Sequence, residues 1–387
     1  MIRIGILTYF ASINYGAFLQ AYALQKCLES RYEHIAEVEI IDYDAKSAHD
    51  YYLNRLTRFG VTAGDKLSKQ YEAFIQERKR LTLSKDKLIS DNLDELRQFL
   101  QGKYDIIIAG SDQIWKTDSF RGFPNAYWLN FDLGETVYMA YAVSGRNSYE
   151  EMSWDQQEYI RNALKRFMYI GTRDAVTRNE LLKIDSRIAI QRNCDPCFLM
   201  PQLFKVSDAD KRKIREKYGI SDSQPMISIM MKNIDIGNRL YRMLKYDNTA
   251  LHLYDANGNM RENNLVEVSP FEWSSLIAAS DLVITDFFHG TVFSILHCVP
   301  FISVEWEEKG RGKIENLLLE NDMRDKFVYR SDYNGNNRAL AIDLYTRGRK
   351  LIKDYTPDMA ERAMTRELQK SNTFFAELDN VIDSIQR

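Results

Sequence analysis

A histidine, a glycine and a threonine follow one short apolar run and could act together on a ligand. The run Leu282–Thr285 has the composition of a buried parallel strand, and the apolar residues after it recur at helical spacing. A helix that begins at the carboxyl edge of a sheet directs backbone N–H groups and the positive end of its dipole toward that edge. His289, Gly290 and Thr291 therefore predict an anion site with a titratable side chain beside it.

The elements around this turn predict a C-terminal βα domain with a sheet of its own. Ligands of open α/β sheets bind beyond the carboxyl ends of the strands. Lys232 follows one predicted strand, and Arg311 and Lys313 follow another, so cations are expected at that edge. The predicted strands of this domain are 226–231, 250–254, 265–268, 282–285 and 301–304.

The N-terminal half opens as a βαβ unit, with a strand at 2–8, a helix and a second strand at 38–42. The loop after the first strand holds Asn14, Tyr15 and Gly16 and faces the carboxyl edge of the sheet. Contact with a ligand and a plain turn with glycine at positive φ explain this loop equally well.

A second polar turn follows the apolar strand predicted at 104–109. Gly110 would let a ligand approach the backbone, and Ser111, Asp112 and Gln113 would supply polar contacts. The alternative is an Asx turn that caps the following segment.

Arg146 and Arg173 both lie at predicted strand ends in this half of the chain. Most surface arginines bind nothing in particular, but two at one sheet edge could hold an anion.

Length and composition restrict the class of protein. A chain of 387 residues is too long to fold around a single hydrophobic core, so two domains are expected. A net charge of −3 predicts no nucleic-acid partner, and no apolar run is long enough for a membrane span. The N-terminus has no signal-peptide pattern, which predicts a cytoplasmic location. Cys194 and Cys197 form a lone CxxC, which lacks the two further ligands of a structural zinc site, so no metal is expected.

Residues 46–103 interrupt the βα rhythm and are predicted to form a helical insertion. Lysine and arginine outnumber acidic residues in its first part, residues 46–80. A solvated helical face is one interpretation of this composition. The other is a basic surface that meets an anionic, lipid-linked substrate at the inner face of a membrane.

Four segments, in order, resemble the polysaccharide pyruvyl transferase family. They are GILTYFASINYGAFLQAYALQ near the N-terminus, YDIIIAGSDQIW, VYMAYAVSG and SDLVITDFFHGTVFSILHCVPFI, and the similarity extends over residues 2 to 320. The resemblance implies an α/β chain of two doubly wound Rossmann-like domains, in a GT-B-like arrangement. These would be an acceptor domain, 1–200, and a donor domain, 201–350, with a C-terminal helix within 351–387 that crosses back to the first domain.

The resemblance also implies a reaction, namely transfer of a pyruvyl group from phosphoenolpyruvate to a sugar with formation of a ketal. No cofactor is implied beyond this donor. Such chemistry needs an acid, a base and groups that hold a carboxylate and a phosphate. His289 is the predicted acid–base catalyst, and Asp112 is predicted to orient or deprotonate an acceptor hydroxyl. His297, eight residues after His289, is predicted to be a packed side chain.

Ligand contacts are expected in both of the predicted domains. In many family members an arginine lies just upstream of this histidine, but here Phe288 directly precedes His289, so another cation must bind the phosphate. Arg311 is the preferred cation. The predicted substrate-binding residues are Asn14, Tyr15, Gly16, Ser111, Gln113, Arg146, Arg173, Lys232, Phe288, Gly290, Thr291, Arg311 and Lys313.

Two other functions are compatible with such a fold, since fold does not determine function. One is a glycosyltransferase that uses a nucleotide sugar. The other is a sugar-binding protein without catalytic activity.

Overall fold

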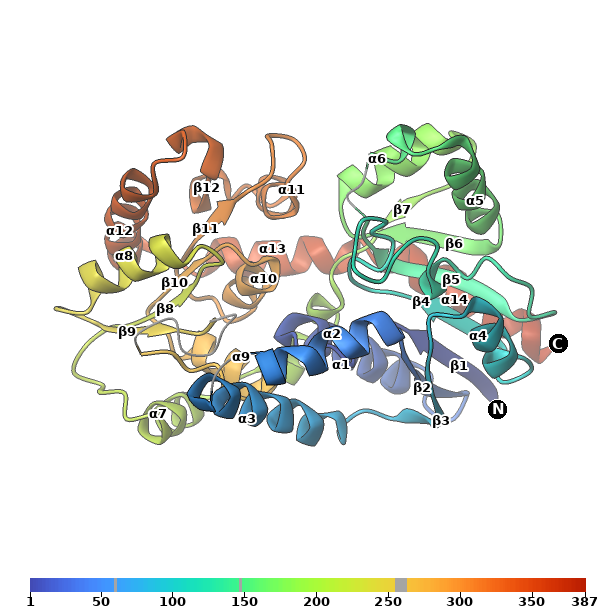
Figure 1. Ribbon diagram of the computed structural model, residues 1–387, viewed down its shortest axis with the longest axis horizontal. Coiled ribbons are helices and arrows are strands. Elements are labelled where there is room, and N and C mark those ends of the chain that lie inside the picture. Colours follow the sequence, from blue (N-terminus) through green and yellow to red (C-terminus); the bar gives the residue numbers. More distant parts are fainter. Residues whose placement is uncertain (59–60, 146–147, 255–262) are drawn as a thin grey trace. The chain divides into compact units, whose positions relative to one another are not determined.

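The computed structural model describes residues 1–58, 61–145, 148–254 and 263–387. It divides into two compact units, each built on one parallel sheet (Figure 1). Unit 1 comprises Met1–Asn54, Arg78–Met200 and Glu367–Arg387, and unit 2 comprises Arg55–Glu77 and Pro201–Arg366. The predicted α/β class with two Rossmann-like sheets is confirmed.

Unit 1 contains a seven-stranded sheet in the order β3-β2-β1-β4-β5-β6-β7, in which every neighbouring pair is parallel. The order reverses at β1, so the turns after β1 and β4 lie side by side at the carboxyl edge, where open α/β sheets bind ligands. The strands are β1 (Ile2–Leu7), β2 (Ala36–Asp44), β3 (Leu83–Ile89), β4 (Ile106–Ala109), β5 (Val137–Val143), β6 (Phe167–Thr172) and β7 (Gln191–Arg192).

Side-chain caps fix where the helices of unit 1 begin. The side chain of Asn14 accepts a hydrogen bond from the backbone N–H of Ala17, and Asp174 caps the helix after β6 in the same way. Gly16 therefore lies in the first turn of a helix and not in a left-handed turn. The helices are α1 (Tyr15–Arg31), α2 (Lys46–Arg58), α3 (Val61–Arg78), α4 (Leu93–Leu100), α5 (Trp154–Leu164), α6 (Ala175–Ile184) and α14 (Asn372–Gln386), of which α3 belongs largely to unit 2.

Unit 2 contains a five-stranded parallel sheet in the order β12-β11-β10-β8-β9. Its strands are β8 (Met226–Met230), β9 (Thr249–His252), β10 (Leu282–Thr285), β11 (Phe301–Glu305) and β12 (Phe327–Tyr329). Its helices are α7 (Asp208–Lys217), α8 (Ile234–Leu244), α9 (Pro270–Ala278), α10 (Phe288–Leu296), α11 (Lys313–Glu320), α12 (Asn337–Asp354) and most of α13 (Asp358–Gln369).

The prediction of a wholly helical insertion at 46–103 is wrong. Residues 83–89 form β3, which pairs in parallel with β2 at the edge of the unit 1 sheet. Its sequence, LSKDKLI, carries the charges that natural edge strands use to prevent further pairing, and these charges conceal the strand pattern. The strand predicted at 265–268 is also absent, because the described chain there makes only an isolated bridge at Asn264.

The C-terminal segment was predicted to form one helix, but it forms two, α13 and α14. Unit 2 extends to Arg366, so the last residues of α13 already belong to unit 1, and a break separates α13 from α14. Ser371 lies at the break, where its buried hydroxyl contacts the Tyr141 hydroxyl at 2.8 Å. Phe374, in the first turn of α14, packs edge-on against the ring of Tyr141. The break therefore anchors α14 in the core of unit 1.

Within the described residues, none of the helices combines the length and hydropathy needed to cross a membrane.

Candidate active site

In unit 2, the turn predicted around His289 forms the start of helix α10. Helix α10 starts at Phe288, and no side chain caps its N-terminus within the described structure. Gly290 lies in the first turn, where a Cβ atom would come within 2.4 Å of the Thr285 hydroxyl oxygen. The glycine thus lets α10 pack closely against the end of β10, and it does not serve to adopt a positive φ.

Thr291 connects α10 to the neighbouring strand β11. Its N–H donates to the Phe287 carbonyl at 3.1 Å, and its buried hydroxyl contacts the Ser303 hydroxyl at 2.8 Å. The N–H hydrogen bond belongs to the first turn of α10, and the hydroxyl contact joins α10 to β11. Thr291 therefore helps to position the helix, and its contact with an anion stays a prediction.

Aromatic rings and lysines surround the first turn of α10. The half-buried ring of His289 lies edge-on to buried Phe288, with 5.4 Å between ring centroids. The ammonium of Lys313 lies 5.4 Å from the centre of the Phe288 ring, and that of Lys232 lies 5.3 Å from the centre of the Phe287 ring. Two positive charges thus accompany the positive end of the helix dipole.

Asp286 connects three strand ends in unit 2. Its buried carboxylate accepts the backbone N–H of Lys232, at 2.9 and 3.1 Å to its two oxygens, and the indole N–H of Trp306 at 2.8 Å. Asp286 therefore holds the turns after β8 and β11 beside the start of α10. Sequence reasoning treated Asp286 only as the end of a strand and did not identify Trp306.

Two buried glutamates shape the loop that carries Arg311. Glu305 accepts backbone N–H groups on both carboxylate oxygens, from Trp306 and Glu307 on one and from Ile314 and Glu315 on the other. Glu315 accepts the N–H groups of Gly310 and Gly312. Neither glutamate was singled out from the sequence, because an ordinary glutamate in a strand or helix gives no signal of such contacts.

In unit 1, the turn after β4 has an unusual backbone. Gly110 has φ 129°, and a Cβ atom there would lie 2.0 Å from the Tyr141 carbonyl oxygen, so only glycine fits. Asp112 has φ 86°, a conformation that is rare outside glycine. The Asp112 carbonyl accepts the N–H of Ser144 at 2.9 Å, which ties the turn to the end of β5. Strained backbone of this kind is concentrated at functional sites.

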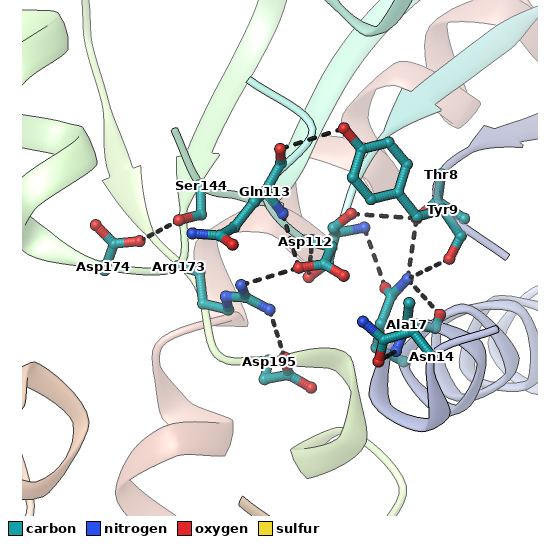
Figure 2. Close-up of polar contacts among 12 residues, drawn as sticks. Thr8, Tyr9, Asn14, Ala17, Asp112, Gln113, Ser144, Arg173, Asp174 and Asp195 are labelled. Atoms are coloured by element: carbon teal, nitrogen blue, oxygen red, sulfur yellow. Dashed lines mark hydrogen bonds and ion pairs between the residues drawn. The ribbon is translucent and has the colours of Figure 1, made fainter. Parts of the chain in front are cut away.

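Arg173 binds two carboxylates. Its guanidinium lies 3.2 Å from Asp112 and 2.9 Å from Asp195, and only 2% of its side chain is exposed (Figure 2). Burial lowers the pKa of Arg173, but Asp112 and Asp195 raise it, and the pKa lies above its usual value. Since both terminal nitrogens of the guanidinium contact a carboxylate, Arg173 holds Asp112 in position. Its contact with a substrate anion stays a prediction. Arg146 lies outside the described residues.

The other predicted residues of unit 1 surround this pair. Ser111 is buried, with its N–H 3.3 Å from the side-chain oxygen of Gln20 and its carbonyl 3.1 Å from the Thr8 hydroxyl. The N–H of Gln113 donates to the carboxylate of the preceding residue, Asp112, at 2.8 Å. The side chain of Asn14 caps α1, as Figure 2 shows, and Tyr15 is half-buried. Gln20 and Thr8 were missed because their contacts lie about a hundred residues away in sequence.

The CxxC cysteines are packed side chains. Cys194 and Cys197 are both fully buried, and burial raises the pKa of the Cys194 thiol to about 12. A thiol with such a pKa is protonated at neutral pH and is a weak nucleophile. The described residues hold no group of three or more His, Cys, Asp or Glu side chains that could bind a metal ion.

His297 is packed in unit 2. Its Nε2 atom lies 2.9 Å from the Ser274 hydroxyl, and burial lowers its pKa to about 3. The unfolded chain protonates this histidine near pH 6.5. The resulting stabilisation is therefore fully present above about pH 6.5 and is lost as the pH falls toward 3.

We expect His297 alone to lower the free energy of unfolding by about 2 kcal/mol between pH 7 and pH 5. Urea denaturation at both pH values would measure it, with His297→Gln expected to lose this part of the pH dependence. His34→Asn, at an exposed histidine, is the control. An identical pH dependence in wild type and His297→Gln would contradict the assignment.

Solved structures similar to this chain share its fold. A glycosyltransferase from Rickettsia africae is 14% identical, with a TM-score of 0.57 and 98% of each chain covered. Anabaena Alr3699/HepE, solved in complex with UDP and glucose, is 13% identical, with a TM-score of 0.57 over 99% of this chain and 100% of its own. The UDP-GlcNAc 2-epimerase from Neisseria meningitidis is 12% identical, with a TM-score of 0.52 over 96% and 99%. The fold is therefore GT-B-like.

Sequence comparison defines the family more closely. The sequence model of the family described as polysaccharide pyruvyl transferase matches residues 14–308. The chain belongs to this family, as its motifs predicted. Comparison with curated proteins finds no match to this chain.

Proposed function

We propose that this protein transfers a pyruvyl group from phosphoenolpyruvate to a sugar of a polysaccharide or of its lipid-linked precursor, releasing phosphate. The observation that carries the proposal is the start of α10. There His289 lies in the first turn of a helix without a side-chain cap, accompanied by the ammonium groups of Lys232 and Lys313. This combination suits a donor with a carboxylate and a phosphate next to the carbon that must be protonated.

The proposed reaction assigns a task to each group. His289 protonates the methylene carbon of phosphoenolpyruvate, which leaves an electrophilic carbon that a first sugar hydroxyl attacks. Phosphate then leaves, and a second hydroxyl closes the ketal, so the two hydroxyl protons balance the protons gained by the methyl group and by phosphate. Lys232, Lys313 and Arg311 bind the donor anions, and Asp112 in unit 1 orients an acceptor hydroxyl.

The experiment is a phosphate-release assay with phosphoenolpyruvate and a panel of nitrophenyl hexosides and lipid-linked sugars, with mass spectrometry of the products. We expect phosphate release that depends on an acceptor, together with a pyruvyl ketal on that acceptor. Turnover of nucleotide sugars without use of phosphoenolpyruvate would instead identify a glycosyltransferase, and binding of sugars without any turnover would identify a sugar-binding protein. If only lipid-linked acceptors react, sedimentation with vesicles would test the proposed association with the inner face of a membrane.

Glu305 provides a test of the donor-binding loop. Glu305→Gln removes the charge that accepts four backbone N–H groups, so the loop that carries Arg311 should lose its position. We expect the KM for phosphoenolpyruvate to rise about tenfold or more, as the loss of about 1.5–3 kcal/mol for charge-assisted hydrogen bonds would give. The KM for the acceptor should change little. Glu308→Gln, at an exposed glutamate of the same loop, is the control. Equal effects on the two KM values would contradict a role in donor binding.

A further inference from the structure

An exposed pair of stacked aromatic rings lies on unit 1. The rings of Tyr51 and Phe120 are nearly parallel, with 17° between their planes and 4.5 Å between their centroids. Although they pack on each other, Tyr51 remains 46% exposed and Phe120 45% exposed. Tyr52 contacts both rings edge-on. Large aromatic side chains gathered at a surface commonly mark a binding site.

Arg121 lies directly beside these rings, with its guanidinium carbon 4.6 Å from the centre of Phe120 and 3.8 Å from the centre of Tyr9. One terminal nitrogen donates to the Ser12 hydroxyl at 3.0 Å. Its Nε atom is buried and has no hydrogen-bond partner within the described structure. A buried N–H donor without a partner costs free energy, which a bound acceptor group would recover.

No carboxylate of the described residues forms an ion pair with Arg121, in contrast to Arg173 on the same unit. Asp44 interacts with Arg121 electrostatically through space, but its carboxylate contacts His49 at 3.2 Å. Among the residues that the structure describes, the guanidinium therefore has a positive charge without an ion-paired carboxylate. An anionic ligand is the chemistry that complements it.

Tyr9 links this cluster to the turn that carries Asp112. One face of its buried ring lies against Arg121, and its hydroxyl donates to the carbonyl of Gln113, the residue after Asp112, at 3.3 Å. Arg121, Tyr9 and Gln113 therefore connect the exposed rings to Asp112. A sugar that presents a hydroxyl to Asp112 belongs to a chain whose neighbouring residues could reach this surface.

We propose that Tyr51, Phe120 and Arg121 form a subsite for an acidic sugar of the acceptor. The C–H bonds of a sugar ring carry partial positive charge and pack on the negative face of an aromatic ring. The Arg121 guanidinium binds the anionic group of that sugar, a carboxylate or a phosphate. The proposal rests on the proposed function, in that it specifies the acceptor, but it is testable by binding alone.

The test is titration of the full-length protein with methyl glucuronide, glucose 1-phosphate and neutral methyl glucoside, followed by NMR and calorimetry. We expect both acidic sugars to bind at least ten times more tightly than the neutral one. Arg121→Gln should abolish this preference, a loss of about 10- to 100-fold for the acidic sugars. The stronger of the two acidic ligands shows whether a uronic acid or a sugar phosphate is recognised.

Further variants separate recognition from loop structure. Phe120→Ala leaves the contact between Arg121 and Ser12 in place, so it should weaken all three sugars, while Arg121→Lys should retain part of the preference for acidic ones. Arg349→Gln removes a comparable arginine that packs on Tyr345 in unit 2 and is the matched control. Equal binding of acidic and neutral sugars by wild type, or an unchanged preference in Arg121→Gln, would overturn the proposal.

Failure of this subsite and failure of the proposed function give different results. Phosphate release from phosphoenolpyruvate with neutral acceptors only, together with no selective binding of acidic sugars, would overturn the subsite and leave the reaction intact. Selective binding of acidic sugars without any use of phosphoenolpyruvate would support the subsite and overturn the reaction.

Discussion

Replacing His289 by glutamine should lower turnover by about 10²- to 10⁴-fold while the protein keeps a melting temperature close to that of wild type. Glutamine retains hydrogen-bonding capacity but cannot titrate near neutral pH, so it removes general acid–base catalysis selectively. Because His289 is only half-buried, in the first turn of α10, its replacement should have little effect on folding. Phosphate release at saturating phosphoenolpyruvate and thermal denaturation would measure the two quantities.

The pH dependence distinguishes catalysis from positioning. In the wild type, kcat should follow a titration that disappears in His289→Gln, whereas a residue that only orients a neighbouring turn would leave the profile unchanged. His34→Asn, at an exposed histidine whose φ of 67° asparagine adopts readily, is the control. A His289→Gln enzyme with full turnover and the wild-type pH profile would end the acid–base hypothesis.

The sequence predicted the parts of the fold that depend on buried strands. Residues 106–109 and 282–285 are apolar or small throughout and fully buried, and the sequence predicted strands at 104–109 and 282–285. The edge strand β3 was missed because its charged residues face solvent. The sequence pattern therefore predicted strands inside each sheet but not the edge strand β3.

The sequence predicted where the candidate site residues lie, but not which residues they contact. Asp112 and His289 lie at carboxyl ends of strands as expected, since this follows from local sequence and the topology of open sheets. The roles of their neighbours depend on contacts between distant residues, which one sequence cannot display. The sequence did not reveal that Asp112 and Asp195, 61 and 22 residues away, contact the guanidinium of Arg173.

The same limitation explains why Asp286 and Trp306 were missed. Asp286 contacts Trp306, 20 residues later, and the backbone of Lys232, 54 residues earlier. Each of these residues is ordinary in its own segment. They act together only because parallel strands bring their carboxyl ends to one edge. Arg121 was likewise unremarked, because Tyr9, which packs on its guanidinium, and Tyr51, which stacks on Phe120, come from distant segments of unit 1.

Removing the charge of Arg173 should destabilise the folded protein far more than removing the charge of an exposed arginine. In Arg173→Met, Asp112 and Asp195 would lie in unit 1 without the guanidinium that both now contact. Breaking a buried ion pair on one side costs about 3–5 kcal/mol, because the remaining charge has lost its hydration without compensation. Urea denaturation at neutral pH would measure this loss. Arg239→Met, which removes an exposed arginine side chain paired with the exposed Asp235, should leave the free energy of unfolding nearly unchanged.

The pH dependence of Arg173→Met provides the decisive observation. Buried carboxylates without a counter-charge favour protonation, so these two groups should add stability to the folded variant as the pH falls from about 7 toward 5, and this gain offsets the loss that unfolded His297 causes in both proteins. In this comparison the wild type should lose stability over the same range, because protonation of unfolded His297 opposes folding. Arg173→Lys keeps the positive charge but not the planar guanidinium that reaches both carboxylates. The pH dependence of its stability should lie between those of wild type and Arg173→Met. If Arg173→Met were as stable as wild type at neutral pH, or lost stability on acidification as wild type does, the two carboxylates would not depend on Arg173.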